Sequence, residues 1–318
     1  MSMLDYDFMQ RALLAALLVG MAAPAVGVYL VQRRQAFMGD GIGHVALTGV
    51  GLGLIMHQSP VLFAVLTAAA GAVAIELIRE QSKASGDVAL SVLFYGGIAG
   101  GVMLASKSDS GANLDAYLFG QLVSVSPDDI KIIVVLAIAV LAVTIGLRRA
   151  LFTVSQDEEF ARVTGLPVRA LNLLVAVTAA VTVTVAMRVV GLLLVSALMV
   201  VPVAIAQQLT RNFAVTMAAS IGIGVLVSVS GTAVTYYSDT PPGPTIVLLA
   251  IGLFIVVGIL ATPLRVRRAH RASAAATEDD LDMAGNAHPD ADLAASGTMS
   301  GTSRAPAAVE NAVEEEPR

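Results

Sequence analysis

The stretch FMQRALLAALLVGMAAPAVGVYL, residues 8–30, sets the class of this fold. It carries a single charge, Arg11, in a run long enough to cross about 30 Å of hydrocarbon as a helix. Asp5 and Asp7 precede it, where a cleavable signal peptide would carry Lys or Arg. We therefore interpret residues 8–30 as a membrane helix of the mature protein.

Composition extends this interpretation to most of the chain. Of 318 residues, 56% are hydrophobic and only 14% charged, whereas soluble domains carry about 25% charged residues. The apolar residues gather in long runs, which predicts an all-α polytopic membrane protein with about nine transmembrane helices, some of them short or broken. The predicted spans are residues 8–31, 37–56, 61–78, 87–105, 129–147, 169–187, 189–209, 213–237 and 244–264.

Charges between these runs predict the orientation. Basic residues fall at alternate ends of the spans, and the positive-inside rule makes those ends cytoplasmic. The N-terminus is then outside and the C-terminus inside. Residues 1–264 form the transmembrane domain in this interpretation. Residues 265–318 form a disordered cytoplasmic tail, because their Ala, Gly, Ser, Asp, Glu and Pro cannot bury enough apolar surface to fold.

The segment MGDGIGH, residues 38–44, is the main candidate site. It places Asp40 four residues before His44, so that a helix would present both on one face. Titratable groups are costly in hydrocarbon, and this pair suits a divalent first-row metal or a proton relay. The alternative is structural, with Arg33 or Arg34 neutralising Asp40 and His44 only packing. The surrounding glycines favour close helix approach or a broken helix.

A polar segment, residues 151–167, separates two predicted spans. Ser155 is its candidate cap for a short helix, with acidic residues near the positive helix end and Gly165 and Pro167 as stop signals. Such a helix, lying along the membrane, would fit a partner's groove, and an ordinary connecting loop is the alternative. The residues of interest are Asp157, Glu158, Glu159, Phe160 and Gly165.

Three further polar residues stand near apolar runs. Glu76 lies one turn before Arg79, which predicts a local ion pair rather than a ligand. Arg188 falls at the predicted outer side and could contact the pathway or a partner, or snorkel to the interface. His57, in a short outer turn, is either a surface residue or an outer contact for metal.

Several classes of function are excluded by missing motifs. With no cysteine, the chain has no disulfide and no thiolate metal site. It has no Walker phosphate loop, HExxH or GxSxG, and no basic, aromatic-laced patch for nucleic acid. The chain therefore does not itself bind ATP by the Walker motif, and it offers no convincing set of residues for an enzyme.

The chain resembles the membrane permease subunits of zinc/manganese/iron-type metal ABC importers, and among them most the zinc-uptake permeases. The resemblance covers essentially residues 8–264, in family order, and its motifs are specific together. They are Arg33-Arg34, FMGDGIGHVAL (37–47), YLFGQLVSVSPDD (117–129), VGLLLVSALMVVPVA (190–204) and DTPPGPTIVL (239–248).

The resemblance implies a homodimer in the bacterial cytoplasmic membrane. It implies a cytoplasmic ABC ATPase docked at residues 155–167 and an extracytoplasmic protein that delivers Zn2+ or Mn2+. No permanently bound cofactor is expected. Asp40 and His44 match the family's acidic and histidine positions, and the pathway would switch by alternating access. A proton-coupled secondary metal transporter is the second hypothesis.

This sequence departs from the family at two places. Some zinc permeases carry a further histidine in the span that here reads SVLFYGG, residues 91–97, which weakens the case for zinc over manganese. The tail after residue 264 is also longer than usual, and the resemblance assigns it no function.

Overall fold

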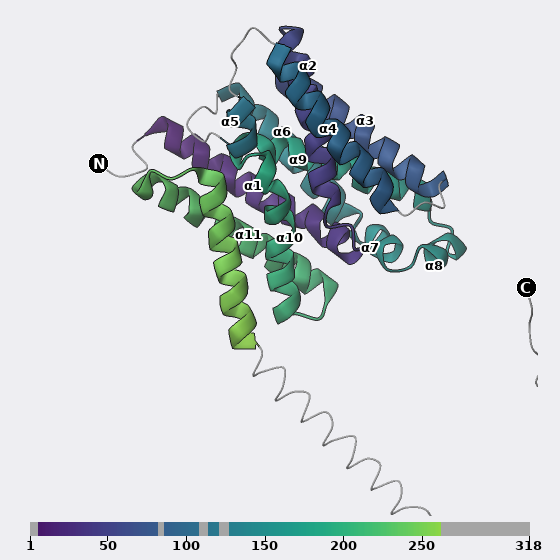
Figure 1. Ribbon diagram of the computed structural model, residues 1–318. Coiled ribbons are helices and arrows are strands. Elements are labelled where there is room, and N and C mark those ends of the chain that lie inside the picture. The colour runs from purple at the N-terminus through teal and green to yellow at the C-terminus, as the bar shows by residue number, and fades with distance from the viewer. Residues whose placement is uncertain (1–5, 82–85, 108–113, 121–126, 262–318) are drawn as a thin grey trace, which may run out of the picture. The chain divides into compact units, whose positions relative to one another are not determined.

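The computed structural model describes residues 6–81, 86–107, 114–120 and 127–261 (Figure 1). The predicted tail, residues 265–318, lies outside these ranges, so its predicted disorder is not tested. Within them the structure is helical and has no strand, which confirms the predicted all-α class. The helices are α1 Asp7–Gln32, α2 Met38–Ile55, α3 Pro60–Gln81, α4 Gly86–Lys107, α5 Leu114–Phe119, α6 Pro127–Gly146, α7 Arg148–Gln156, α8 Glu158–Val163, α9 Val168–Val189, α10 Leu192–Leu209, α11 Phe213–Ser238 and a final helix Pro242–Ala261.

Each of the nine predicted spans coincides with a helix, but not all are simple crossings. Seven of the described helices are long and apolar enough to span a membrane. A further span is formed only if α6 and α7 act together, and these two helices meet at a 67° bend. In α10, the described apolar stretch Val195–Leu209 is shorter than a full span, and Gly191, with φ of 89°, separates this helix from α9. The described part of the chain therefore has seven or eight candidate spans.

Helix α1 runs through the centre of the transmembrane unit. Of its most apolar stretch, 78% is buried, against 22% for the final helix and 11% for α4. Its most extensive contacts are with α11, and it also packs on α6, α9 and α10. Alanine and glycine dominate its buried face, which lets neighbouring backbones approach closely, as is usual between membrane helices.

Helices α2, α3 and α4 lie side by side as a second group (Figure 1). The contact of α2 with α4 is the most extensive in the molecule, and that of α2 with α3 is next. Helices α7 and α8 lie near the C-terminal end of α1, where Gln32 donates a hydrogen bond of 2.7 Å to Gln156. This arrangement places α2 in the interior and α8 at one end of the unit.

Candidate functional site

Asp40 and His44 lie in the first two turns of α2, which is continuous from Met38 to Ile55. A broken helix, one of the two expectations from the glycines, is therefore not found. The Asp40 carboxylate is partly buried and accepts a hydrogen bond of 2.5 Å from Ser196 Oγ on α10. Asp40 also complements the positive N-terminal end of α2.

His44 points toward α4. Its ring packs edge-on against Phe94, with 4.4 Å between ring centroids, and only 7% of the residue is exposed. Its Nδ1 atom is buried without a hydrogen-bond partner among the described residues. Because most buried polar groups are paired, an unpaired ring nitrogen is a candidate ligand atom.

Glycines bring α2 unusually close to its neighbours. A Cβ atom added at Gly97 of α4 would lie 2.5 Å from the carbonyl carbon of His44, so only glycine fits there. Thr48 Oγ1 donates to the Gly97 carbonyl oxygen at 2.8 Å on the next turn. We call the contact of α2 with α4 and α10 around Asp40 and His44 the α2 seam. The predicted role of glycine in close approach is confirmed.

The structural alternative for Asp40 is not supported. In the described part of the chain, no ion pair joins Asp40 to Arg33 or Arg34. Arg33 turns instead toward α7, where its Nε donates to Ser155 Oγ at 3.2 Å. Asp40 therefore faces α10 rather than a nearby base.

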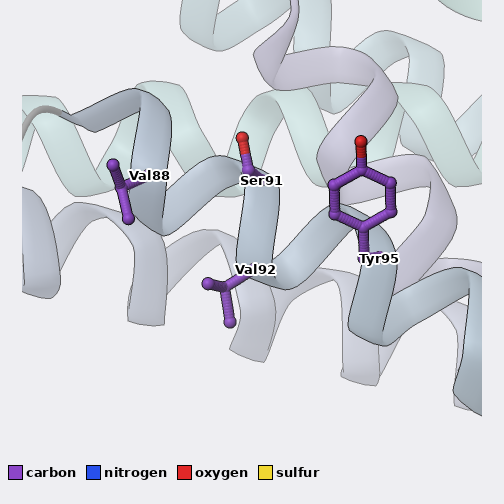
Figure 2. Close-up of a pocket in the computed structure, with 4 residues that line it drawn as sticks. All are labelled: Val88, Ser91, Val92 and Tyr95. Atoms are coloured by element: carbon purple, nitrogen blue, oxygen red, sulfur yellow. The ribbon is translucent and has the colours of Figure 1, made fainter.

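The face of α4 opposite α2 is exposed and carries Ser91 and Tyr95 of the stretch 91–97. Figure 2 shows Ser91 and Tyr95 one turn apart with their hydroxyl oxygens on the same side. With Val88 and Val92 they line an open hollow of about 490 Å³. Because Phe94 and Gly97 face α2 instead, these two hydroxyls lie on the side of α4 away from His44.

Helix α8 forms as predicted, but with a different cap. Asp157 Oδ1 accepts a hydrogen bond of 2.9 Å from the Phe160 backbone amide, which makes Asp157 the N-cap. The prediction that Ser155 caps this helix is wrong. Ser155 lies inside α7, where its hydroxyl bonds to the Leu151 carbonyl oxygen and receives the Arg33 bond. Gly165 ends the helix with φ of 80°, as expected.

Glu158 faces the membrane unit rather than outward. Its Oε1 lies 3.4 Å from Arg79 Nη2 and accepts a hydrogen bond of 3.0 Å from Asn172 Nδ2 on α9. Arg79 also pairs with Glu76 at 2.9 Å, which confirms the predicted local ion pair on α3. We call Glu76, Arg79, Glu158 and Asn172 the α8 network. It ties α8 to α3 and α9.

The outer side of α8 carries both acidic and apolar side chains. Asp157 and Glu159 are exposed, and so are Phe160 (59%) and Val163 (87%). Large apolar side chains exposed on a short helix at the end of the molecule are typical of a protein-binding surface. Sequence reasoning selected Phe160 for this role and did not select Val163.

The two remaining predicted positions lie apart from the α2 seam. His57 is exposed in the turn between α2 and α3, with φ of 52°. Helix α2 extends 11 residues from His44 to its end at Ile55, about 16 Å along its axis. Arg188 is the penultimate residue of α9, and its side chain lies outside the described part of the structure.

Comparison with known proteins decides the family. Residues 5–261 match the ABC 3 transport family. The chain belongs to this family. It is 32% identical to a "Probable metal transport system membrane protein" of Treponema pallidum, over 83% of this chain and 100% of the relative. It is 31% identical to the "Manganese transport system membrane protein MntC" of Halalkalibacterium halodurans, over 86% and 96% respectively.

A solved structure agrees with this assignment. The structure of "PsaBC from Streptococcus pneumoniae in complex with Fab" matches with a TM-score of 0.73 and 29% identity, over 80% of this chain and 92% of that one. The resemblance to the membrane permeases of metal ABC importers, inferred from the sequence motifs, is therefore confirmed. The chain is a multi-pass membrane permease subunit of an ABC importer, and the family does not itself catalyse ATP hydrolysis.

Proposed function

We propose that this chain forms the translocation pathway of an ATP-driven importer of a divalent metal ion, Mn2+ or Zn2+, with Asp40 and His44 as ion contacts. The observation that carries the proposal is the buried, unpaired Nδ1 of His44 one helical turn from a carboxylate. Carboxylate oxygen and imidazole nitrogen suit both metals. The relatives whose names cite metal or manganese transport support the same class of cargo.

Two protein ligands leave most of an ion's shell open. No group of three or more His, Cys, Asp or Glu side chains gathers within the described ranges. Water, backbone carbonyls or the same pair from a second copy of the chain must therefore supply the other ligands. A weak, open site suits a pathway, because an ion bound too tightly cannot leave.

Coupling to ATP is proposed to run through α8. A cytoplasmic ATPase would bind the exposed side of the helix, with Phe160 as an apolar anchor. Glu158 would pass the movement inward, since it bonds to α3 and α9, both of which contact α2. Alternating access would follow from these movements, with a binding protein delivering metal on the other side.

The orientation follows from the same assignment. We place the α8 end in the cytoplasm, the N-terminus outside and the C-terminus inside, because basic residues gather at the α8 end. The chain has no cysteine, so single cysteines can report on this. An impermeant thiol reagent applied to whole cells should label Ser59→Cys, in the turn after α2, and should spare Glu159→Cys. The reverse pattern would contradict the orientation.

The main test is metal uptake into proteoliposomes that contain permease, ATPase and binding protein. Asp40→Asn and His44→Ala should each reduce Mn2+ or Zn2+ uptake by at least about 100-fold, the upper range for residues that only orient a ligand. His57→Ala serves as the matched control and should retain most uptake. Full uptake by the Asp40 and His44 variants would refute the site.

A proton-coupled transporter is the competing function, because the Ser196–Asp40 hydrogen bond could also belong to a proton relay. It requires the permease alone to accumulate metal when a proton gradient is applied. The ABC importer predicts no accumulation until ATPase and ATP are added. Comparing the two conditions in the same vesicles distinguishes the two mechanisms.

A further inference from the structure

A cavity of about 250 Å³ lies beside the start of α2, at the α8 end of the unit. Arg33, Arg34 and Arg79 line it, and its described lining contains no Asp or Glu. Its remaining walls include apolar side chains from three helices: Met38 of α2, Ile75 of α3 and Leu90 of α4. The cavity therefore combines three guanidinium groups with an apolar surface.

Arg33 has hydrogen-bonding capacity that the protein does not use. Its Nε donates to Ser155, but its Nη2 is buried and has no partner among the described residues. Burial lowers the pKa of the Arg33 guanidinium, and the charge of Arg79 lowers it further, although Glu158 and Glu76 oppose this. Both carboxylates are already paired with Arg79. An anion in the cavity would offset the repulsion between Arg33 and Arg79 and pair with the guanidinium groups that line it.

Arg34 occupies a position where glycine is the usual residue. Its amide bonds to the Val31 carbonyl oxygen at 3.1 Å and the Gln35 amide to the Leu30 carbonyl oxygen at 2.8 Å, a Schellman cap on α1. Arg34 has the left-handed φ of 57° that this cap requires. The left-handed conformation is less favourable for arginine than for glycine. The presence of arginine there suggests a functional role for its guanidinium group.

The surroundings of the cavity favour a lipid as the source of the anion. Phe37, at the N-cap of α2, lines the cavity and is 75% exposed. Aromatic side chains at helix ends are typical of the membrane–water interface. A volume of about 250 Å³ is below the range of about 300–1,000 Å³ for drug-sized ligands. The volume is sufficient for a phosphate headgroup but not for acyl chains, which would lie outside, along Phe37.

We propose that this cavity binds the phosphate headgroup of an anionic phospholipid, with Arg33, Arg34 and Arg79 as donors and Phe37 against the acyl chains. Basic pockets between membrane helices recognise such headgroups on the cytoplasmic side. The inference rests on the proposed function only in taking the α8 end as cytoplasmic. Its test needs neither metal nor ATPase, so it can fail independently.

The chain lacks tryptophan, which allows a direct test. Full-length Phe37→Trp permease in phosphatidylcholine vesicles carries one reporter, which brominated lipids quench on contact. Brominated phosphatidylglycerol should quench at lower mole fraction than brominated phosphatidylcholine. Adding Arg34→Gly, which suits the left-handed turn, should reduce this preference about fivefold, the effect of one Lys or Arg at an anionic surface.

Two controls make the test specific. Arg149→Gln removes an exposed arginine at the same end of the unit and outside the cavity lining, and should leave the preference unchanged. Arg34→Lys should largely retain it. Equal quenching by the two lipids, or equal effects of Arg34→Gly and Arg149→Gln, would overturn the proposal. Loss of the preference in millimolar inorganic phosphate would overturn it in favour of a soluble phosphate site.

Discussion

The α2 seam and the α8 network are two polar regions in the described part of this permease, and they are stabilised in different ways. In the seam, backbones touch through glycine, Asp40 accepts a hydrogen bond from Ser196, and His44 Nδ1 has no partner among the described residues. In the network, charged side chains pair directly, because Arg79 contacts both Glu76 and Glu158, although Asn172 Oδ1 is buried without a partner among the described residues. Close backbone packing fixes the positions of Asp40 and His44. Partly exposed ion pairs contribute little free energy, so they can break and re-form as helices move.

The largest expected effect is a backbone clash in the seam. Gly97→Val would place a Cβ 2.5 Å from the His44 carbonyl carbon and should destabilise the permease by about 3 kcal/mol or more. Thermal unfolding of the purified protein measures this. Gly96→Val is the matched control, because no atom lies within 4 Å of its added Cβ. Similar stability of the two variants would mean that the seam is not tightly packed.

The next effect concerns the hydrogen bond to Asp40. Ser196→Ala removes the donor that orients the carboxylate and should weaken the apparent affinity for Mn2+ or Zn2+ by about tenfold, as for other residues that orient a metal ligand. The concentration dependence of uptake measures it. Ser230→Ala, which changes a partly buried serine of α11 that bonds to its own helix, should have no effect. An unchanged affinity would mean that Asp40 does not contact the transported ion.

At the α8 end, the cap should have a moderate effect. Asp157→Ala removes the acceptor for the Phe160 amide and should cost about 1 kcal/mol of helix stability, which weakens binding of the ATPase. Co-purification at several ATPase concentrations measures the affinity. Asp157→Asn retains a capping oxygen and should bind normally. If the two variants bind equally poorly, charge rather than capping explains the loss.

The smallest effect on stability should come from the network. Arg79 and Glu158 side chains are 26% and 40% exposed, so Glu158→Gln should cost less than about 1 kcal/mol. It should nevertheless reduce the metal ions imported per ATP hydrolysed, because α8 loses its ion pair to α3. Glu159→Gln, on the exposed side, should leave that ratio unchanged. A large loss of stability would mean that the network is structural rather than coupling.

Local features of this chain were predictable from the sequence. The apolar runs located the helices because burial in hydrocarbon requires a continuous stretch of defined length. Glu76 and Arg79 pair as predicted because three residues along a helix bring side chains together. Gly165 ends α8 because a left-handed residue is needed there.

The prediction was wrong where two nearby residues could serve as the same helix cap. Ser155 and Asp157 are both good N-cap residues, and they stand two positions apart just before α8. Ser155 lies within α7 and accepts a hydrogen bond from Arg33, so Asp157 caps α8 instead. Likewise, the bend between α6 and α7 follows no proline, and only the structure reveals it.

The sequence by itself determined that this is a helical membrane permease, that Asp40 and His44 share a face, and that α8 is a candidate docking helix. Only the tertiary structure decided what those residues meet. Ser196 is 156 residues from Asp40, Glu158 is 79 from Arg79, and Gly97 reaches His44 from another helix. Helix formation depends on neighbours along the chain, whereas these partners depend on how the helices pack, which no local pattern records.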